Sequence, residues 1–166
     1  MVVRILIVED EGITALDVEQ YLTEEGYSVC TAATAREGAE KIHTFNPDLV
    51  FMDIDLGGPI DGIELAQQIQ KGSNVGIVYL TGHGECNIRT RAKSTRPLGF
   101  VLKPFDATDL KLAIEVALCR REFRCRAKGQ VLPFVLQVCS LECQPRVRTQ
   151  LRCPLEQECM SSLKSC

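Results

Sequence analysis

Short apolar runs alternate with amphipathic segments along the first 118 residues, and this alternation restricts the fold more than any other feature of the sequence. The apolar runs are rich in β-branched residues, as expected of strands buried on both faces of a sheet. They lie at residues 2–8, 27–31, 48–52, 75–80 and 98–102. Strands and helices that alternate in this way form βαβ units with right-handed crossovers. The sequence therefore predicts an α/β fold with a doubly wound, five-stranded parallel sheet.

The segments between and after these runs repeat apolar residues at helical spacing. They lie at residues 13–25, 34–45, 61–69, 85–93 and 106–118. Thr34 and Asp61 are each followed three residues later by a glutamate, which is the pattern of a capping box at a helix N-terminus. In the first helix, the apolar residues expected to face the sheet are Ile13, Leu16, Tyr21 and Leu22.

The overall composition is that of an ordinary globular protein. The chain has 166 residues, of which 45% are hydrophobic and 25% are charged. No apolar run approaches the roughly 18 residues needed to span a bilayer, and we expect no signal peptide because the N-terminus lacks a small-residue cleavage pattern. These features exclude membrane-spanning, collagen-like and wholly disordered classes.

Charge and cysteine content change towards the C-terminus. Residues 1–118 carry 10 Lys+Arg and 18 Asp+Glu, whereas residues 119–166 carry 9 and 4, together with seven of the nine cysteines. Such a change indicates two regions under different physical constraints. We therefore predict a folded domain over residues 1–120 and a separate basic, cysteine-rich tail over residues 121–166.

The tail shows no pattern of an output domain. Pro133 interrupts its main apolar run, and its cysteine spacing does not fit a paired C-x2-C zinc site. We expect it to be poorly ordered and to bind no DNA directly, because a DNA-reading domain needs clear amphipathic helices. The basic run at residues 120–126 is expected to extend the last helix rather than to contact nucleic acid.

Polar residues that can carry chemistry stand where the predicted strands end. Glu9 and Asp10 follow the first strand, Asp53 ends the third, Thr81 follows the fourth and Lys103 follows the fifth. Ligands bind beyond the carboxyl ends of the strands in open α/β sheets, so these side chains are expected to converge. Grouped carboxylates repel one another unless a cation neutralises them, and Mg²⁺ prefers such oxygen ligands. The sequence therefore predicts a magnesium site at this edge.

Five motifs that surround these residues occur in order along the chain: V-E-D-E, F-M-D-I-D-L, D-G-I-E, Y-L-T-G and G-F-V-L-K-P-F. With them, residues 2–119 resemble the receiver domain of two-component response regulators. The resemblance implies a flavodoxin-like (βα)5 fold with strand order 2-1-3-4-5. It also implies a cytoplasmic protein that acts as a stand-alone phosphoacceptor switch rather than as an enzyme.

The resemblance assigns roles to the acidic residues. Asp53 would accept a phosphoryl group from a sensor histidine kinase or a phosphotransfer protein. A carboxylate is a weak nucleophile, so the transfer depends on positioning and on neutralisation of charge. Asp10 and Asp53 would bind Mg²⁺ directly, Glu9 would bind it through water, and Asp55 would contribute its backbone carbonyl.

The resemblance also assigns roles to three residues on the fourth and fifth strands. Lys103 would offset the charge of the incoming phosphoryl group, and Thr81 would donate its hydroxyl to a phosphoryl oxygen. Phe100 falls at the aromatic switch position, where the family more often has tyrosine, and would turn inward when Thr81 moves. The Lys103–Pro104 bond matches a position where the family holds a cis peptide.

Two further residues and one surface complete the set of expectations. Asp55 and His83 lie two residues beyond Asp53 and Thr81, at positions that tune phosphoryl lifetime in the family. The surface formed by residues 85–93, 98–102 and the last helix would bind a downstream protein or a homodimer mate, unless the chain is a relay intermediate that passes the phosphoryl group on. Its basic residues are Arg89, Arg91, Lys93 and Arg96.

Two other phosphate-related functions fit the sequence less well. The pair Asp53-x-Asp55 also resembles the motif of haloacid-dehalogenase phosphotransferases, although Gly57 stands where those enzymes usually have threonine. Flavin binding is disfavoured, because Glu9, Asp10 and Glu11 would repel the flavin phosphate at the first strand–helix turn.

Overall fold

The predicted parallel sheet is confirmed by a computed structural model, which describes residues 2–82 and 86–127, with the backbone alone over 86–89 and 121–127. The strands are β1 (Arg4–Val8), β2 (Ser28–Ala32), β3 (Leu49–Asp53), β4 (Gly76–Thr81) and β5 (Gly99–Leu102). The helices are α1 (Gly12–Glu24), α2 (Ala35–Phe45), α3 (Gly62–Gly72), α4 (Cys86–Lys93) and α5 (Ala107–Ala127). The strands are all parallel and lie in the order β2-β1-β3-β4-β5, which matches the flavodoxin-like prediction.

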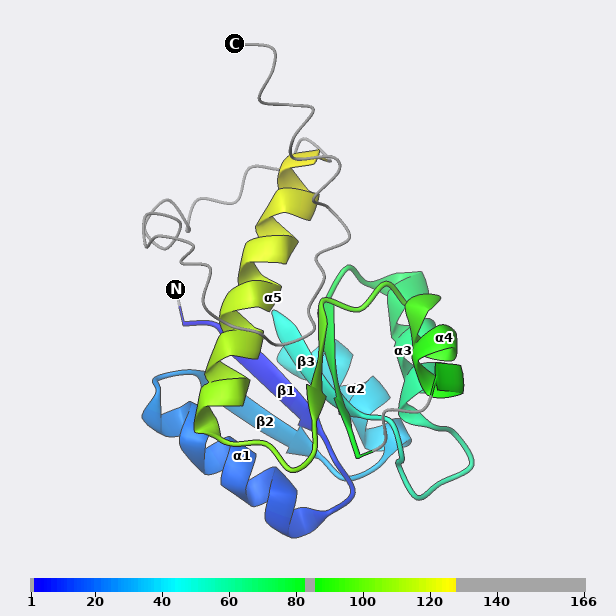
Figure 1. Cartoon of the computed structure of the whole chain (residues 1–166), viewed down its shortest axis with the longest axis horizontal. Helices are drawn as coiled ribbons and strands as arrows, with labels where there is room; N and C mark the ends of the chain where they lie inside the picture. Colours follow the sequence, from blue (N-terminus) through cyan, green and yellow to red (C-terminus); the bar gives the residue numbers. More distant parts are fainter. Residues whose placement is uncertain (1, 83–85, 128–166) are drawn as a thin grey trace. The chain divides into compact units, whose positions relative to one another are not determined.

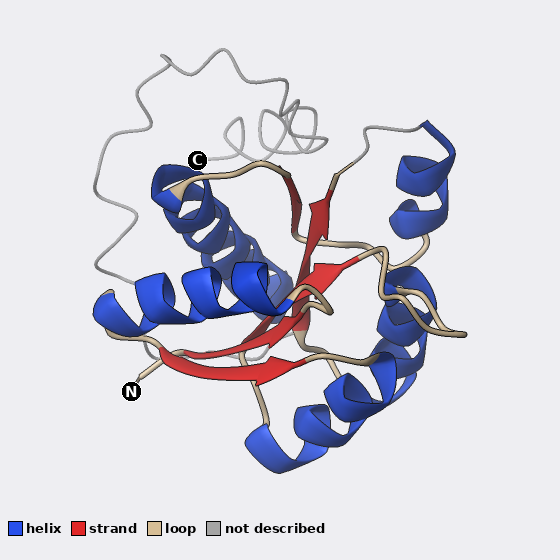
Figure 2. Cartoon of the chain, turned by 90° about the horizontal axis from the view of Figure 1, so that it is seen from below, coloured by secondary structure: helices blue, strands red, loops and turns tan. Residues whose placement is uncertain are grey.

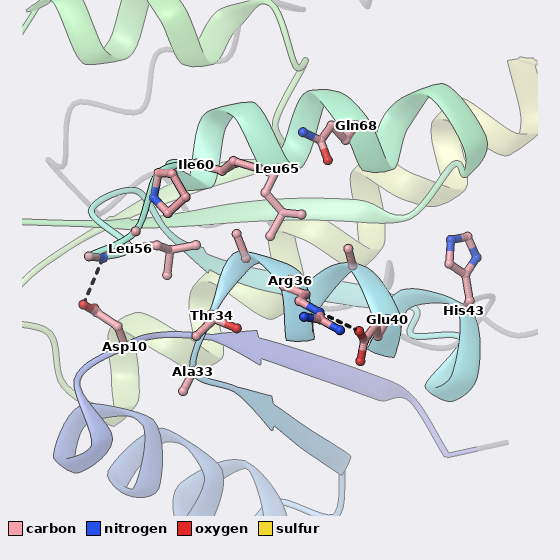
Figure 3. Close-up of a pocket in the computed structure, with 15 residues that line it drawn as sticks. Asp10, Ala33, Thr34, Arg36, Glu40, His43, Leu56, Ile60, Leu65 and Gln68 are labelled. Carbon is pink, nitrogen blue, oxygen red and sulfur yellow. Dashed lines mark hydrogen bonds and ion pairs between the residues drawn. The ribbon is translucent and has the colours of Figure 1, made fainter.

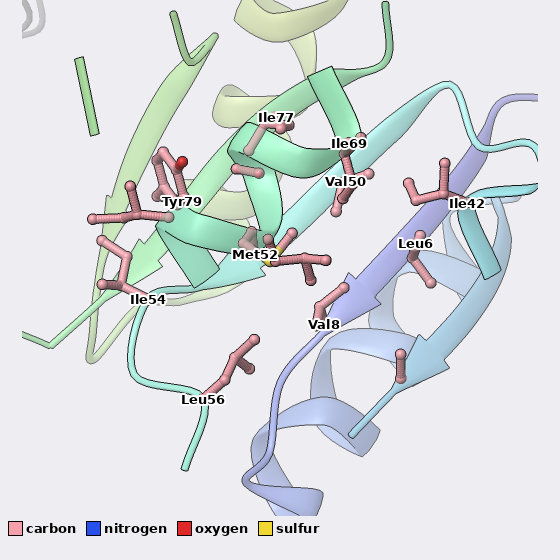
Figure 4. Close-up of a cluster of buried hydrophobic side chains, with 14 of the residues drawn as sticks. Leu6, Val8, Ile42, Val50, Met52, Ile54, Leu56, Ile69, Ile77 and Tyr79 are labelled. Carbon is pink, nitrogen blue, oxygen red and sulfur yellow. The ribbon is translucent and has the colours of Figure 1, made fainter. Parts of the chain in front are cut away.

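Helices cover both faces of the sheet, as Figures 1 and 2 show. On one face, α1 and α5 pack over a buried cluster to which α5 contributes Leu110 and Ile114. On the other face, α2, α3 and α4 cover a second cluster, to which α3 contributes Ile69 (Figure 4). The central strands β3 and β4 are buried along their whole length because both of their faces are covered.

Both residues predicted to cap a helix do so, but only the capping box at Asp61 is complete, because the side chain of Glu37 accepts the N–H of Ala33 and not that of Thr34. The side chain of Thr34 accepts a hydrogen bond from the backbone N–H of Glu37 at the start of α2, at 3.2 Å. Asp61 accepts one from the N–H of Glu64 at 2.8 Å, and the Glu64 side chain accepts the N–H of Asp61 in return. These caps satisfy backbone donors that have no partner inside the helix.

The predicted inner stripe of the first helix is wrong at two positions. In α1 the buried residues are Ala15, Val18 and Leu22, whereas Ile13 and Leu16 are 74% and 65% exposed. Residues 15, 18 and 22 share one helical face, which is the face that α1 turns towards the sheet. The larger Ile13 and Leu16 lie on a different face and remain at the surface.

The last helix continues past the predicted domain boundary. Helix α5 extends to Ala127, so a boundary at residue 120 falls within it, and residues 120–126 extend the helix as expected. The division into a domain and a tail remains a prediction, because residues 128–166 lie outside the described residues. His83, at a position predicted to tune phosphoryl lifetime, also lies outside them. Within the described ranges, no helix is long and apolar enough to cross a membrane.

Candidate functional site

The strand-end residues gather at one edge of the sheet because the strands are parallel and nearly in register. Asp53, the last residue of β3, pairs with Leu80 of β4, and Thr81 follows directly. Thr81 in turn pairs with Leu102, which precedes Lys103. Glu9 and Asp10 follow β1, which is the neighbour of β3 on the other side. The edge thus carries the predicted residues from four adjacent strands.

Lys103 is the cation at the centre of this edge. Its ammonium Nζ donates hydrogen bonds to Oε1 of Glu9 and to Oδ2 of Asp53, each at 2.8 Å. The backbone N–H of Lys103 also donates to the carbonyl of Thr81 at 2.8 Å, and the Lys103–Pro104 peptide is cis, as the resemblance implied. Lys103 is therefore fixed to β4 by its backbone and to two carboxylates by its side chain.

The three acidic residues lie close enough to share one cation. Glu9, Asp10 and Asp53 each offer a carboxylate oxygen, and these oxygens all lie within 4.8 Å of one another. The loop that follows β3 contacts two of these groups. The N–H of Gly57 donates to Oδ2 of Asp10 at 3.1 Å, and the N–H of Asp55 donates to Oδ1 of Asp53 at 3.3 Å.

Burial changes the proton affinity of Glu9. The side chain is fully buried, and loss of hydration raises its pKa to about 7, against the lowering effect of its hydrogen bond to Lys103. For Lys103, burial alone would lower the pKa, but the hydrogen bonds to Asp53 and Glu9 outweigh that effect and raise it. The site therefore favours a charged lysine while it disfavours a further negative charge.

The donor set fits a hard divalent cation. It consists of carboxylate oxygens, which are the ligands that Mg²⁺ prefers. In addition, Oε2 of Glu9 is buried and has no hydrogen-bond partner, although it lies 2.7 Å from Nζ of Lys103. A single ammonium leaves the three carboxylates incompletely neutralised, so the cluster has both the charge and the spare acceptor that a cation or its bound water requires.

The remaining predicted residues differ in their surroundings. Thr81 is 3% exposed at the end of β4, and Phe100 is half-buried on β5. Asp55 is exposed beside the site. On the predicted partner surface, Arg91 is half-exposed and forms a 2.5 Å ion pair with Asp61, the N-cap of α3. The side chain of Arg89 lies outside the described part of the structure.

Two residues next to the switch positions were missed at the sequence level. Tyr79 is fully buried, and its ring stacks on Phe100 with centroids 5.6 Å apart. Its hydroxyl lies 2.8 Å from Oγ1 of Thr95, which is also fully buried. A tyrosine in an apolar strand signals a need for a polar partner, but the sequence does not identify that partner 16 residues away.

An open groove of about 770 Å³ borders the acidic cluster at Asp10 (Figure 3). Its walls come from α2, the loop after β3 and α3, and they include the apolar residues Leu56, Ile60 and Leu65. Arg36 pairs with Glu40 at its rim. The loop after β3 thus lines this groove together with Asp10 of the acidic cluster.

The geometry agrees with what comparison with known proteins shows. Residues 5–115 match the family model of the response regulator receiver domain. The chain belongs to the response regulator receiver family. This receiver domain acts as the phosphoacceptor switch of a two-component system. The haloacid-dehalogenase alternative receives no support from these matches.

Curated relatives of this receiver are longer proteins. The transcriptional regulatory protein PdtaR of Mycobacterium tuberculosis is 34% identical over 129 residues, which cover 77% of this chain and 62% of the relative. The nitrogen assimilation regulatory protein NtrX of Azorhizobium caulinodans is 37% identical over 126 residues, which cover 72% of this chain and 28% of the relative. The receiver chain therefore spans only part of the length of these relatives.

Solved receiver domains have the same fold. One is the N-terminal domain of a response regulator/sensory box/GGDEF 3-domain protein from Carboxydothermus hydrogenoformans, with a TM-score of 0.68 and 35% identity over 73% of this chain and 98% of that one. Another is a CheY-like receiver domain protein from Methanospirillum hungatei, with a TM-score of 0.70 and 29% identity over 75% and 99% of the two chains.

Proposed function

We propose that Asp53 is the phosphoacceptor of this receiver and that it takes its phosphoryl group from a phosphohistidine on a histidine kinase or phosphotransfer protein. The observation that carries the proposal is the position of Lys103, whose ammonium contacts Asp53 and Glu9 at 2.8 Å beside Asp10. Of the carboxylates in the cluster, Asp53 is the one that ends a central strand, where a rigid element fixes its position.

The transfer moves one phosphoryl group between two atoms. A carboxylate oxygen of Asp53 forms a bond to phosphorus while the bond from phosphorus to the histidine nitrogen breaks, and the electron pair stays on the imidazole. Lys103 keeps one donor on Glu9 and turns another from Asp53 to a phosphoryl oxygen, and the hydroxyl of Thr81 donates to a second oxygen. These donors stabilise charge as it develops on the transferred group.

Mg²⁺ is the cation that we assign to the acidic cluster. Asp10 and Asp53 would hold it directly, Glu9 would hold it through water, and Asp55 would add its backbone carbonyl. Its positive charge would let the phosphoryl group approach carboxylates that otherwise repel it. The buried acceptor on Glu9 and the spacing of the three carboxylates support this assignment.

The output of phosphorylation is a change in the surface formed by α4, β5 and α5. We propose that Thr81 moves towards the phosphoryl group, that Phe100 turns inward, and that a downstream protein or a homodimer mate then binds this surface. A ligand or modification shifts such an equilibrium only if it contacts the two states differently. We further propose that residues 1–120 act as the receiver and that this receiver works in the cytoplasm.

Phosphorylation by a small donor tests the assignment of Asp53. The protein is incubated with acetyl phosphate and Mg²⁺, and the modified residue is mapped by mass spectrometry. One phosphoryl group on Asp53 is expected, and it should be lost in Asp53→Asn and in the presence of a chelator. Asp17→Asn, which removes an exposed carboxylate on α1, serves as the matched control. Modification at another residue, or modification that persists in Asp53→Asn, would overturn the proposal.

A further inference from the structure

Tyr79 connects the positions that move in the proposed switch. The register of β4 and β5 places it opposite Phe100, and the two rings stack with an interplanar angle of 29°. Thr81 lies two residues further along β4 and therefore on the same face of the sheet. Figure 4 shows Tyr79 within the buried cluster, to which α3 contributes Ile69 and α4 contributes Ala92. The ring of Tyr79 thus stacks on Phe100, and its side chain lies on the same face of β4 as that of Thr81.

The hydroxyl of Tyr79 joins β4 to the end of α4. It lies 2.8 Å from Oγ1 of Thr95, and the hydroxyl of Thr95 donates to the carbonyl of Ala92 at 2.7 Å. A threonine hydroxyl has one proton, and here that proton is used on Ala92. Tyr79 is therefore the donor to Thr95, and the bonds run in one direction from β4 to the C-terminal part of α4.

The segment that carries Thr95 is also held to α3. The side-chain amide of Gln70 donates to the carbonyl of Thr95, and that of Gln67 donates to the hydroxyl of Ser94 at 3.2 Å. Two elements, β4 and α3, therefore hold the connection between α4 and β5. For this connection to move, the hydrogen bonds that hold it to β4 and α3 have to break.

We propose that the Tyr79–Thr95 hydrogen bond is a latch that stabilises the resting state against the inward turn of Phe100. The proposal rests on the proposed function, in which Phe100 moves. Phe100 is half-buried here and packs on a cluster that contains Tyr79 and Ala92. Because interiors are close-packed, a phenyl ring that moves further in must displace its fully buried neighbours. The Tyr79–Thr95 contact is the bond that such a displacement breaks.

The latch has a measurable consequence for binding of a phosphoryl group. A buried neutral hydrogen bond contributes enough that its loss shifts an equilibrium by about three- to tenfold. A variant that lacks the bond starts nearer to the active state. It should therefore bind a phosphoryl analogue more tightly by about the same factor, because less of the binding free energy is needed to convert the resting state into the active state.

The experiment compares variants of the full chain by two measurements. Tyr79→Phe removes the donor and keeps the ring, Thr95→Val removes the acceptor and keeps the shape, and Thr95→Ser keeps the hydroxyl. Tyr21→Phe removes a tyrosine hydroxyl on the opposite face of the sheet and is the matched control. The affinity for beryllofluoride with Mg²⁺ is measured, and ¹⁹F NMR of 4-fluorophenylalanine introduced at Phe100 reports the position of its ring.

In Tyr79→Phe and Thr95→Val we expect beryllofluoride affinity to rise by about three- to tenfold, and the unliganded Phe100 signal to shift towards its liganded position. Thr95→Ser and Tyr21→Phe should resemble the wild type, and the double variant should gain no more than either single one because both remove the same bond. Unchanged or weaker affinity in both single variants would refute the latch while leaving the phosphoacceptor intact. If the wild type binds no beryllofluoride, the proposed function fails, and the latch fails with it.

Discussion

The sharpest test of the site's construction is a glycine that allows α3 to begin directly behind the phosphoacceptor strand. Gly62 is the first residue of α3, and its N–H donates to the carbonyl of Ile54 at 3.0 Å. A β-carbon on Gly62 would overlap the carbonyl oxygen of Asp53 and would lie 2.9 Å from its carbonyl carbon and 3.1 Å from Cα of Ile54. Both groups are backbone, so no side chain can turn away to make room.

The free energy of unfolding in Gly62→Ala follows from two opposing effects. Alanine favours a helix over glycine by at most about 1 kcal/mol. Against this, relief of the overlap costs about 1–3 kcal/mol, and loss of the bond to Ile54 leaves a buried carbonyl unsatisfied at a cost of about 1–3 kcal/mol. We therefore expect a net destabilisation of about 1–5 kcal/mol. Gly72→Ala, at the other end of α3 with open space around it, should be neutral or slightly stabilising.

Urea unfolding followed by circular dichroism measures both variants. The same two proteins are then phosphorylated with acetyl phosphate, and the displaced backbone of Asp53 should slow the reaction in Gly62→Ala but not in Gly72→Ala. Helix propensity alone predicts that both alanines stabilise the protein. A Gly62→Ala variant as stable as Gly72→Ala, and phosphorylated as fast, would refute the argument that close backbone approach at Gly62 positions Asp53.

Three further predictions concern proton binding, donor docking and phosphoryl lifetime. With magnesium chelated, the free energy of unfolding should fall by about 3 kcal/mol between pH 4.5 and about 7. The reason is that Glu9 has a pKa of about 7 in the folded protein, so the folded protein binds more protons in this pH range than the unfolded chain does. Urea unfolding of Glu9→Gln should lack this slope, and parallel pH profiles for the variant and the wild type would contradict the prediction. Replacing the exposed Ile13 and Leu16 by serine should slow phosphotransfer from the cognate kinase but not from acetyl phosphate, because exposed apolar residues mark contact with a protein partner. Equal slowing with both phosphodonors would argue against docking of the kinase at these two residues. Asp55→Asn and His83→Ala should change the half-life of the phosphorylated protein, measured by loss of the phosphorylated mass, and unchanged half-lives would remove the assigned role in lifetime.

The parts of this molecule that the sequence predicts are those encoded by local patterns. The alternation of strands and helices predicts the sheet, and parallel strands bring residues that follow their carboxyl ends to one edge. Glu9, Asp53 and Lys103 could therefore be placed together, although Lys103 is 94 residues from Glu9 in the chain. The helix N-caps at Thr34 and Asp61 are likewise local, since donor and acceptor lie three residues apart.

The features that escaped prediction depend on contacts between segments. Apolar periodicity placed Ile13 and Leu16 inside, but the face of α1 that meets the sheet carries Ala15, Val18 and Leu22. The bond from Gly57 to Asp10 spans 47 residues, and its donor is a backbone N–H, which every non-proline residue carries. The Thr95 partner of Tyr79 likewise belongs to a connection whose path only the folded chain defines.

The charges at the site explain why its function and its cation are coupled. Three carboxylates and one ammonium leave the cluster with an excess of negative charge, and burial already raises the pKa of Glu9. Phosphorylation exchanges the single negative charge of the Asp53 carboxylate for a phosphoryl group that carries about −1.5 to −2 charges at neutral pH. Lys103 can follow that group, but it then gives up part of its contact with the carboxylates, so one ammonium cannot neutralise both. A divalent cation held by the same oxygens resolves this conflict, which is why we expect transfer to Asp53 to depend on magnesium even when Lys103 is intact.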